Sequence, residues 1–136
     1  MIKLIVTDVD GTLLTEGTSE PQPQITATVR KLINKGITFA FASGRSYESI
    51  LGVFPELENE AVYISNNGAC VTEKGNTIVS YAIDKETVAG VVDYIRSVSG
   101  SNILVTTEKY SYTESKDKEF IDWITYGYST DLQCVD

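Results

Sequence analysis

The chain of 136 residues contains no histidine. This absence excludes the Ser-His-Asp triad, the Cys-His pair and every zinc or iron site that needs an imidazole ligand. Acid and base chemistry then falls to carboxylates, with lysine, tyrosine and cysteine as weaker choices. The two cysteines, Cys70 and Cys134, form no CxxC motif and indicate no disulfide framework, so we expect a reducing compartment.

Basic residues are scarce, because 11 Lys and Arg stand against 19 Asp and Glu, which gives a net charge of −8. This balance argues against nucleic acid and anionic lipid as partners, since both need a basic surface. No apolar run approaches the about 20 residues of a membrane span, and the N-terminus shows no signal-peptide cleavage site. We therefore expect a cytoplasmic protein that binds neither nucleic acid nor membranes.

Strand and helix patterns alternate in the first half of the chain. Short apolar runs predict buried strands at residues 2–6, 38–42 and 61–64. Helical spacing between them predicts one helix that ends at Gly36 and a shorter one that ends before Pro55. The alternation predicts an α/β fold with a parallel sheet.

The pattern changes after Gly68. Residues 69–72 and 77–81 flank a predicted hairpin turn, and Asp84 is a suitable N-cap for a helix that ends at Gly100. Strands are expected at 103–107 and 110–113, followed by a helix at 116–124 that faces Phe120, Ile121, Trp123 and Ile124 inward. Residues 126–136 have no clear period, and we place a domain boundary near residues 81–84.

Polar residues follow each of the three predicted parallel strands. They are Asp8 and Asp10, then residues 43–45, then Asn66 and Asn67. Ligands of open parallel sheets lie beyond the carboxyl ends of the strands, so we expect these clusters to form one site. Two carboxylates as close as Asp8 and Asp10 repel each other, which indicates a cation between them or one protonated carboxyl group. Oxygen ligation with few protein groups suits Mg²⁺.

These strand ends resemble motifs of the haloacid dehalogenase superfamily. The segment TDVDGTLL at residues 7–14 is similar to its first motif, ASGR at 42–45 to its second, and SNNGA at 65–69 to a segment of the Cof-like sugar-phosphatase subgroup. The resemblance extends from residue 1 to about residue 113. It implies a three-layer Rossmann-like parallel sheet over residues 1–82, as the N-terminal part of the core, and part of an α+β cap over residues 83–136.

The resemblance also implies a Mg²⁺-dependent hydrolase of small phosphorylated metabolites such as sugar phosphates. Asp8 would be the nucleophile that forms an aspartyl-phosphate, a role that a carboxylate fills without histidine. Asp10 would protonate the leaving oxygen and then activate water. The Asp8 carboxylate and the main-chain carbonyl of Asp10 would hold Mg²⁺.

Five further residues are implied as phosphate or substrate contacts. The Ser43 hydroxyl and the Gly44 N–H would bind phosphoryl oxygens, and Asn67 would position the substrate or order the site. Arg45 would be either a second phosphate contact or a solvated surface residue. Thr12 would supply an N–H or hydroxyl, or only form a local turn.

The family has two more motifs, a lysine and an acidic Gly-Asp segment, and nothing after residue 113 matches either. We therefore expect this chain to be the N-terminal part of a longer protein. Without the other half, the strand at 2–6 would be an exposed apolar edge, which a second copy or the missing C-terminal half would cover.

Three alternatives stay open. The chain binds phosphate or a partner protein without turnover, or it is a glycosyltransferase that uses Asp8 and Asp10 as a DxD metal motif. A phosphoacceptor receiver domain is the third, although its acceptor aspartate would sit where this chain has Asn66 and Asn67.

Overall fold

The computed structural model describes residues 1–15, 18, 20–108, 110–127 and 131–136. The chain divides into two compact units, Met1–Ser80 and Tyr81–Asp136. The predicted roles of residues 1–82 as a partial core and of 83–136 as a partial cap stay predictions.

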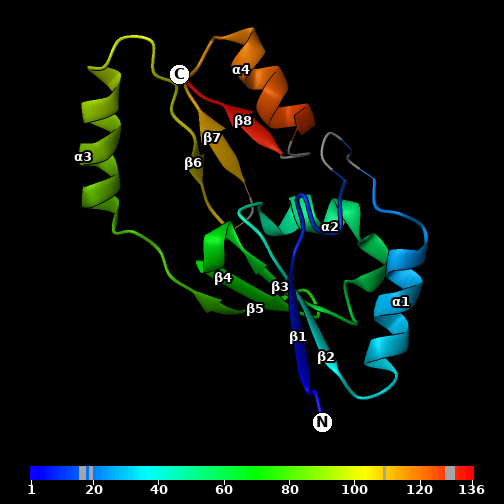
Figure 1. Ribbon diagram of the computed structural model, residues 1–136. Coiled ribbons are helices and arrows are strands. Elements are labelled where there is room, and N and C mark those ends of the chain that lie inside the picture. The colour runs from blue at the N-terminus through cyan, green and yellow to red at the C-terminus, as the bar shows by residue number, and fades with distance from the viewer. Residues whose placement is uncertain (16–17, 19, 109, 128–130) are drawn as a thin grey trace. The chain divides into compact units, whose positions relative to one another are not determined.

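A mixed five-stranded sheet forms the first unit. Its strands lie side by side in chain order: β1 (Leu4–Asp8), β2 (Thr38–Ala42), β3 (Val62–Ser65), β4 (Cys70–Glu73) and β5 (Asn76–Ser80) (Figure 1). The first three strands are parallel, and β4 and β5 are antiparallel to their neighbours. The alternation of strands and helices therefore predicted the parallel part of the sheet correctly, and the antiparallel hairpin extends it.

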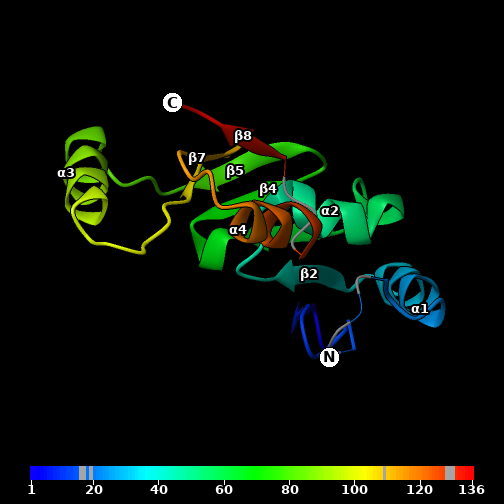
Figure 2. The ribbon, with the colours of Figure 1, turned by 90° about the horizontal axis from the view of Figure 1, so that it is seen from above.

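Two helices connect the parallel strands. Helix α1 (Gln24–Ile33) lies beside β2 (Figure 2) and is followed by Gly36, which has a φ of +77° and donates its N–H to the Ile33 carbonyl at 2.8 Å. Helix α2 (Tyr47–Val53) begins after Ser46, whose hydroxyl accepts the Ser49 N–H at 3.2 Å. A hydroxyl at the N-cap satisfies a donor that the helix itself leaves unpaired.

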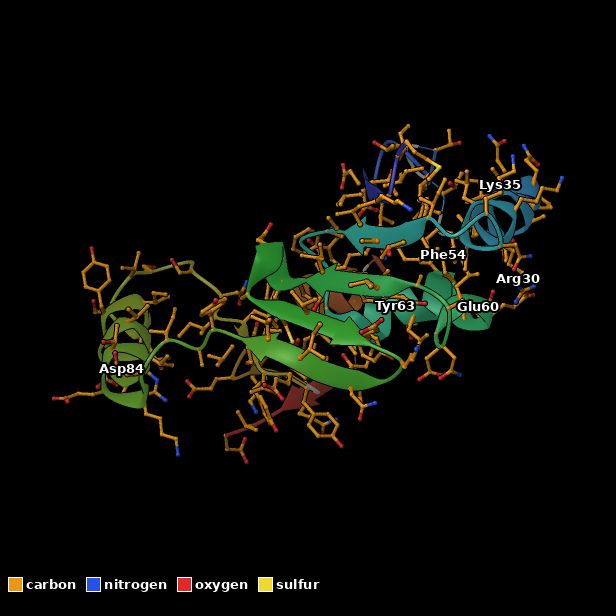
Figure 3. The ribbon with its side chains drawn as sticks, turned by 90° about the horizontal axis from the view of Figure 1, so that it is seen from below. Arg30, Lys35, Phe54, Glu60, Tyr63 and Asp84 are labelled. Carbon is orange, nitrogen blue, oxygen red and sulfur yellow. The ribbon has the colours of Figure 1, made fainter. Side chains whose placement is uncertain are left out.

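The core of the first unit is aromatic. Phe41 of β2 is fully buried and stacks on Phe54, with ring centroids 4.4 Å apart and planes 14° apart. Tyr63 of β3 is also fully buried, and Figure 3 shows Phe54 and Tyr63 next to the sheet. At the surface, Arg30 of α1 pairs with Glu60 at 2.9 Å and with Glu56 at 3.2 Å. Exposed pairs of this kind contribute little, so the buried rings stabilise the unit.

The prediction of a buried strand at residues 2–6 is wrong in position and in burial. The strand is β1, and Asp8 is its last residue instead of lying beyond it. Strand β1 is at the end of the strand order, next to β2, and Leu4 and Val6 are 55% and 50% exposed. The expected exposed apolar edge is thus present among the described residues, because burial of a strand depends on its neighbours as well as on its own sequence.

The β4–β5 hairpin turns at Lys74 and Gly75, both with positive φ (50° and 72°). Positive φ at both central residues is typical of the type I′ turn, whose twist matches that of the flanking strands. The predicted hairpin is therefore present, with its strands shifted by one residue.

The second unit contains α3 (Lys85–Arg96), a small sheet of β6 (Val105–Thr106), β7 (Ser111–Thr113) and β8 (Leu132–Cys134), and α4 (Lys118–Asp122). Asp84 caps α3 as predicted by accepting the Thr87 N–H at 2.9 Å, and Figure 3 labels it at the start of that helix. The helix ends at Arg96, before the predicted end at Gly100.

Three other expectations for the second unit need correction. Trp123, expected to face inward, is 56% exposed, whereas Ile124 is buried as expected; both lie in a π-helical turn over Trp123–Gly127 that continues α4. Strand β6 is shorter than the predicted 103–107. Strand β8 lies in the segment without a clear period and pairs in parallel with β7. In the part of the chain that the structure describes, no helix is long and apolar enough to cross a bilayer.

Candidate active site

Asp8 and Asp10 lie on either side of a buried anchor at the end of β1. Val9 is fully buried, and its carbonyl accepts the N–H groups of Thr12, Leu13 and Leu14 at 3.3, 2.9 and 2.9 Å. The anchored turn leaves both carboxylates exposed, and the Val9 N–H donates to Asp8 Oδ1 at 2.8 Å. Burial of the apolar residue between them thus presents the two aspartates to solvent.

The Asp10 carboxylate meets the second polar cluster. Arg45 Nη2 donates to Asp10 Oδ1 at 2.8 Å, and Arg45 Nε donates to Oδ2 at 3.0 Å. The Ser43 hydroxyl lies 3.5 Å from Asp10 Oδ2, at the outer limit of a hydrogen bond. The hydrogen bonds and positive charge of Arg45 lower the pKa of Asp10, with a smaller contribution from Ser43 and against the opposing effect of burial.

The loop after β2 is joined to the loop after β3 by main-chain hydrogen bonds. The Asn66 N–H donates to the Arg45 carbonyl at 2.8 Å, and the Asn67 N–H donates to the Ser43 carbonyl at 3.1 Å. Asn66 and Asn67 have φ angles of 51° and 56°. Asparagine tolerates this left-handed region better than most residues, which explains why this amide pair can form the turn.

Gly44 is in close contact with Asn67. A Cβ added to Gly44 would lie 3.0 Å from Asn67 Oδ1 and 3.4 Å from Nδ2. The side-chain amide of Asn67 therefore occupies the space that any larger residue at position 44 would need. The absence of a side chain at Gly44 thus lets the Asn67 amide lie directly against its main chain.

The structure thus brings together Asp10, Ser43, Gly44, Arg45 and Asn67. Asp8 joins them through the sheet, because it pairs in register with Ala42, the residue before Ser43. The interpretation of Arg45 as a solvated surface residue is wrong, since its side chain is only 7% exposed. The site roles themselves stay predictions.

The structure changes the interpretation of Thr12 and adds Ser49 to the residues of this site. The N–H of Thr12 donates to the Val9 carbonyl, so the turn uses the group that was a candidate phosphate donor, and only the hydroxyl stays open. Ser49, which the sequence reasoning did not select, is fully buried and accepts Arg45 Nη1 at 3.1 Å. Arg45 lies before the N-cap of α2, so helical spacing gave no signal for this contact.

The residues that the structure describes contain no group of three or more His, Cys, Asp or Glu side chains placed to hold a metal ion. Mg²⁺ in proteins is often held by one or two carboxylates, with water and substrate phosphate completing its shell. The oxygen donors at the end of β1 therefore fit Mg²⁺ in type.

Comparison with known proteins decides the family. The family of haloacid dehalogenase-like hydrolases matches residues 5–133. The chain belongs to this family. The resemblance of the three strand-end motifs is thereby confirmed, and so is the predicted fold class at the level of a mixed parallel sheet with helices. The glycosyltransferase and receiver-domain alternatives are wrong.

The alignments with individual relatives include most of this chain but only about half of each relative. The Escherichia coli 5-amino-6-(5-phospho-D-ribitylamino)uracil phosphatase YbjI is 28% identical over 99% of this chain and 50% of its own length. The structure of a haloacid dehalogenase-like hydrolase from B. subtilis is 27% identical, with a TM-score of 0.76, over 89% of this chain and 42% of that one. A crystal structure from Eubacterium rectale is 26% identical, with a TM-score of 0.84, over 99% and 51%. The chain thus spans about half the length of the E. coli and E. rectale relatives.

Proposed function

We propose that this chain carries the nucleophile and phosphate-binding half of a Mg²⁺-dependent phosphomonoester hydrolase. The observation that carries the proposal is the meeting of Asp10, Ser43 and Arg45 beside the end of the strand that ends in Asp8. Membership of a hydrolase family supports it.

Asp8 suits the role of nucleophile because it is exposed and its orientation is fixed at one oxygen by the Val9 N–H. In the first step a carboxylate oxygen of Asp8 forms a bond to phosphorus while the bond from phosphorus to the ester oxygen breaks. The product of this step is an aspartyl-phosphate and an alcohol, once the leaving oxygen has gained a proton.

Asp10 is the proposed source of that proton and the base for the second step. Water then attacks phosphorus, gives its proton to Asp10 and releases inorganic phosphate and the Asp8 carboxylate. The lowered pKa of Asp10 favours its carboxylate form, which suits the water-activating step and opposes the protonated form that the first step needs.

The loop at Ser43 and Gly44 is the proposed holder of the phosphoryl oxygens. The Ser43 hydroxyl lies 3.5 Å from Asp10 Oδ2, and the Asn67 amide lies against Gly44. Donors placed in advance stabilise developing negative charge more than mobile water does. The Thr12 hydroxyl is a further candidate contact at the turn after β1.

The Asp8 carboxylate and the Asp10 main-chain carbonyl are the proposed protein ligands of Mg²⁺. When bound, the ion supplies neutralisation of phosphoryl charge, which lowers the repulsion between an anionic nucleophile and an anionic substrate. The net charge of −8 makes local neutralisation more important, because these 136 residues together repel phosphate.

The proposed substrate class is a small phosphorylated metabolite, such as a sugar phosphate. The name of the E. coli relative describes a phosphorylated ribityl compound, which is a monoester of this kind. Non-catalytic phosphate or partner binding is the second candidate, favoured by the lowered pKa of Asp10, which makes this residue a poorer proton donor.

The test is turnover of p-nitrophenyl phosphate by the purified chain with and without Mg²⁺. We expect turnover that depends on Mg²⁺ and falls by at least about 1,000-fold in Asp8→Asn, the order of loss on removing a nucleophile. Asp93→Asn, an exposed change of the same kind in α3, should keep the wild-type rate. A folded wild-type chain without turnover would refute catalysis by this chain and favour the binding function.

A further inference from the structure

Arg45 is tied into the site by its side chain and by its main chain. Beside its bonds to Asp10, Nη1 donates to the Ser49 hydroxyl at 3.1 Å. Its own N–H donates to the Ser43 hydroxyl at 3.2 Å, and its carbonyl accepts the Asn66 N–H at 2.8 Å. One buried residue therefore connects the turn after β1, the loop after β2 and the loop after β3.

Burial is unequal within the ion pair. The Arg45 side chain is 7% exposed, whereas the Asp10 side chain is 51% exposed. A phosphate that arrives from solvent therefore finds Asp10 far more accessible than the guanidinium. Two of the nitrogens of Arg45 already point at the two oxygens of one carboxylate, which is the planar geometry that favours this residue over lysine.

We propose that Arg45 is a positioning residue that fixes the Asp10 carboxylate against Ser43, and that it is not a phosphate contact. The inference rests on the proposed function, since Asp10 matters for the role it would have in phosphoryl transfer. Proton transfer needs the donor and acceptor within hydrogen-bond reach, and a misplacement of about 1 Å can lower a rate by about 100-fold. A side chain held at both oxygens cannot rotate away from that place.

The ion pair could instead serve stability alone. A buried pair is weak evidence for stability, because desolvation of the charges offsets much of their attraction. The loop after β2 and the loop after β3 are also joined by main-chain hydrogen bonds that do not involve the guanidinium. A purely structural role and a positioning role therefore predict different results for Arg45→Lys, which keeps the positive charge but removes the paired N–H donors of the guanidinium.

The first experiment needs no turnover. The chain has three arginines, Arg30, Arg45 and Arg96, so their Nε–H signals can be assigned by NMR one variant at a time. We expect the Arg45 Nε–H signal to shift in Asp10→Asn and to stay in place in the matched variant Asp8→Asn. Should Asp10→Asn fail to fold, the ¹³C signal of the Asp10 carboxyl group in Arg45→Lys gives the same information. The proposal would be overturned if the Arg45 Nε–H signal did not shift in Asp10→Asn, or if it shifted when inorganic phosphate was added with Mg²⁺.

The second experiment separates kcat from KM. In a chain that turns over p-nitrophenyl phosphate, Arg45→Lys should lower kcat by about 10- to 100-fold with KM within about twofold, because lysine keeps the charge and loses the fork. The control Arg30→Lys alters an exposed arginine that also pairs with two carboxylates, and should leave both constants unchanged. A rise in KM at constant kcat would make Arg45 a phosphate contact, and unchanged constants would leave only a structural role.

Failure of the proposed function has a different signature. A wild-type chain without turnover refutes catalysis, while the dependence of the Arg45 signal on Asp10 still tests the positioning contact.

Discussion

Replacing Gly44 with alanine tests the close contact at the centre of the site. The φ of Gly44 lies outside the left-handed region, so alanine is not strained by the backbone there. Its Cβ would lie 3.0 Å from Asn67 Oδ1, a few tenths of an ångström inside normal contact, so the Asn67 amide must shift. Overpacking of this kind costs about 1 kcal/mol at the low end.

The gain from a less flexible unfolded chain, about 0.4–1 kcal/mol, offsets much of that cost. We therefore expect Gly44→Ala to destabilise the first unit by at most about 0.6 kcal/mol. The affinity for inorganic phosphate should fall by more than the stability does, because the methyl group and the displaced Asn67 amide crowd the Gly44 N–H, the proposed phosphate donor.

A double-mutant cycle with Asn67→Gly isolates the contact. Glycine suits the φ of 56° at position 67 and has no amide for the new methyl group to meet. Without the overpacking only the gain from the unfolded chain is left, so Gly44→Ala should stabilise this background by about 0.4–1 kcal/mol. The coupling between the two substitutions then equals the overpacking cost of about 1 kcal/mol.

Hydrogen exchange of the β2 amides is the suitable assay, because the single tryptophan, Trp123, belongs to the second unit. Phosphate affinity in the presence of Mg²⁺ follows from titration calorimetry. An equal cost of Gly44→Ala in both backgrounds would refute the assignment of that cost to the Asn67 side chain.

Two more predictions concern the first unit. Val6 is 50% exposed on the edge strand β1, so Val6→Lys should reduce concentration-dependent self-association in sedimentation analysis, and unchanged association would exclude this edge as its cause. Burial, and then the charge of Glu58, raise the pKa of Tyr47 from 10.0 to about 12. The unfolded chain loses this proton at a lower pH than the folded chain, so the free energy of unfolding should fall as the pH rises from 10 towards about 12. In alkaline denaturation, Tyr47→Phe should lose less of this free energy than the wild type. Equal losses in the two proteins would contradict the role of Tyr47.

Features encoded by local sequence were predictable. Gly36 ends α1 at a positive φ, Ser46 caps α2 and Asp84 caps α3, each through atoms within a few residues along the chain. These positions follow from hydrogen-bonding groups that a helix cannot satisfy by itself. The order of strand ends likewise placed Asp8 and Ser43 at the same edge of the sheet, because parallel strands share their carboxyl ends.

Features that depend on distant partners were not predictable. The apolar run at the N-terminus has the composition of a buried strand, yet the exposure of Leu4 and Val6 depends on what lies beside β1. Arg45 allowed two interpretations from the sequence, a second phosphate contact or a solvated surface residue, and neither included a buried carboxylate partner. Its pairing with Asp10, 35 residues away, needed the fold.

The same pairing changes the argument for the metal. From the sequence, Asp8 and Asp10 required a cation between them or a proton on one of them. The structure supplies a third solution, since the guanidinium of Arg45 balances the charge of Asp10 within the protein. Repulsion between the aspartates is therefore no reason by itself to expect Mg²⁺. The reason lies in the reaction, because an ionised Asp8 must approach a phosphoryl group that is itself negative, and the positive charge of Arg45 is already committed to Asp10.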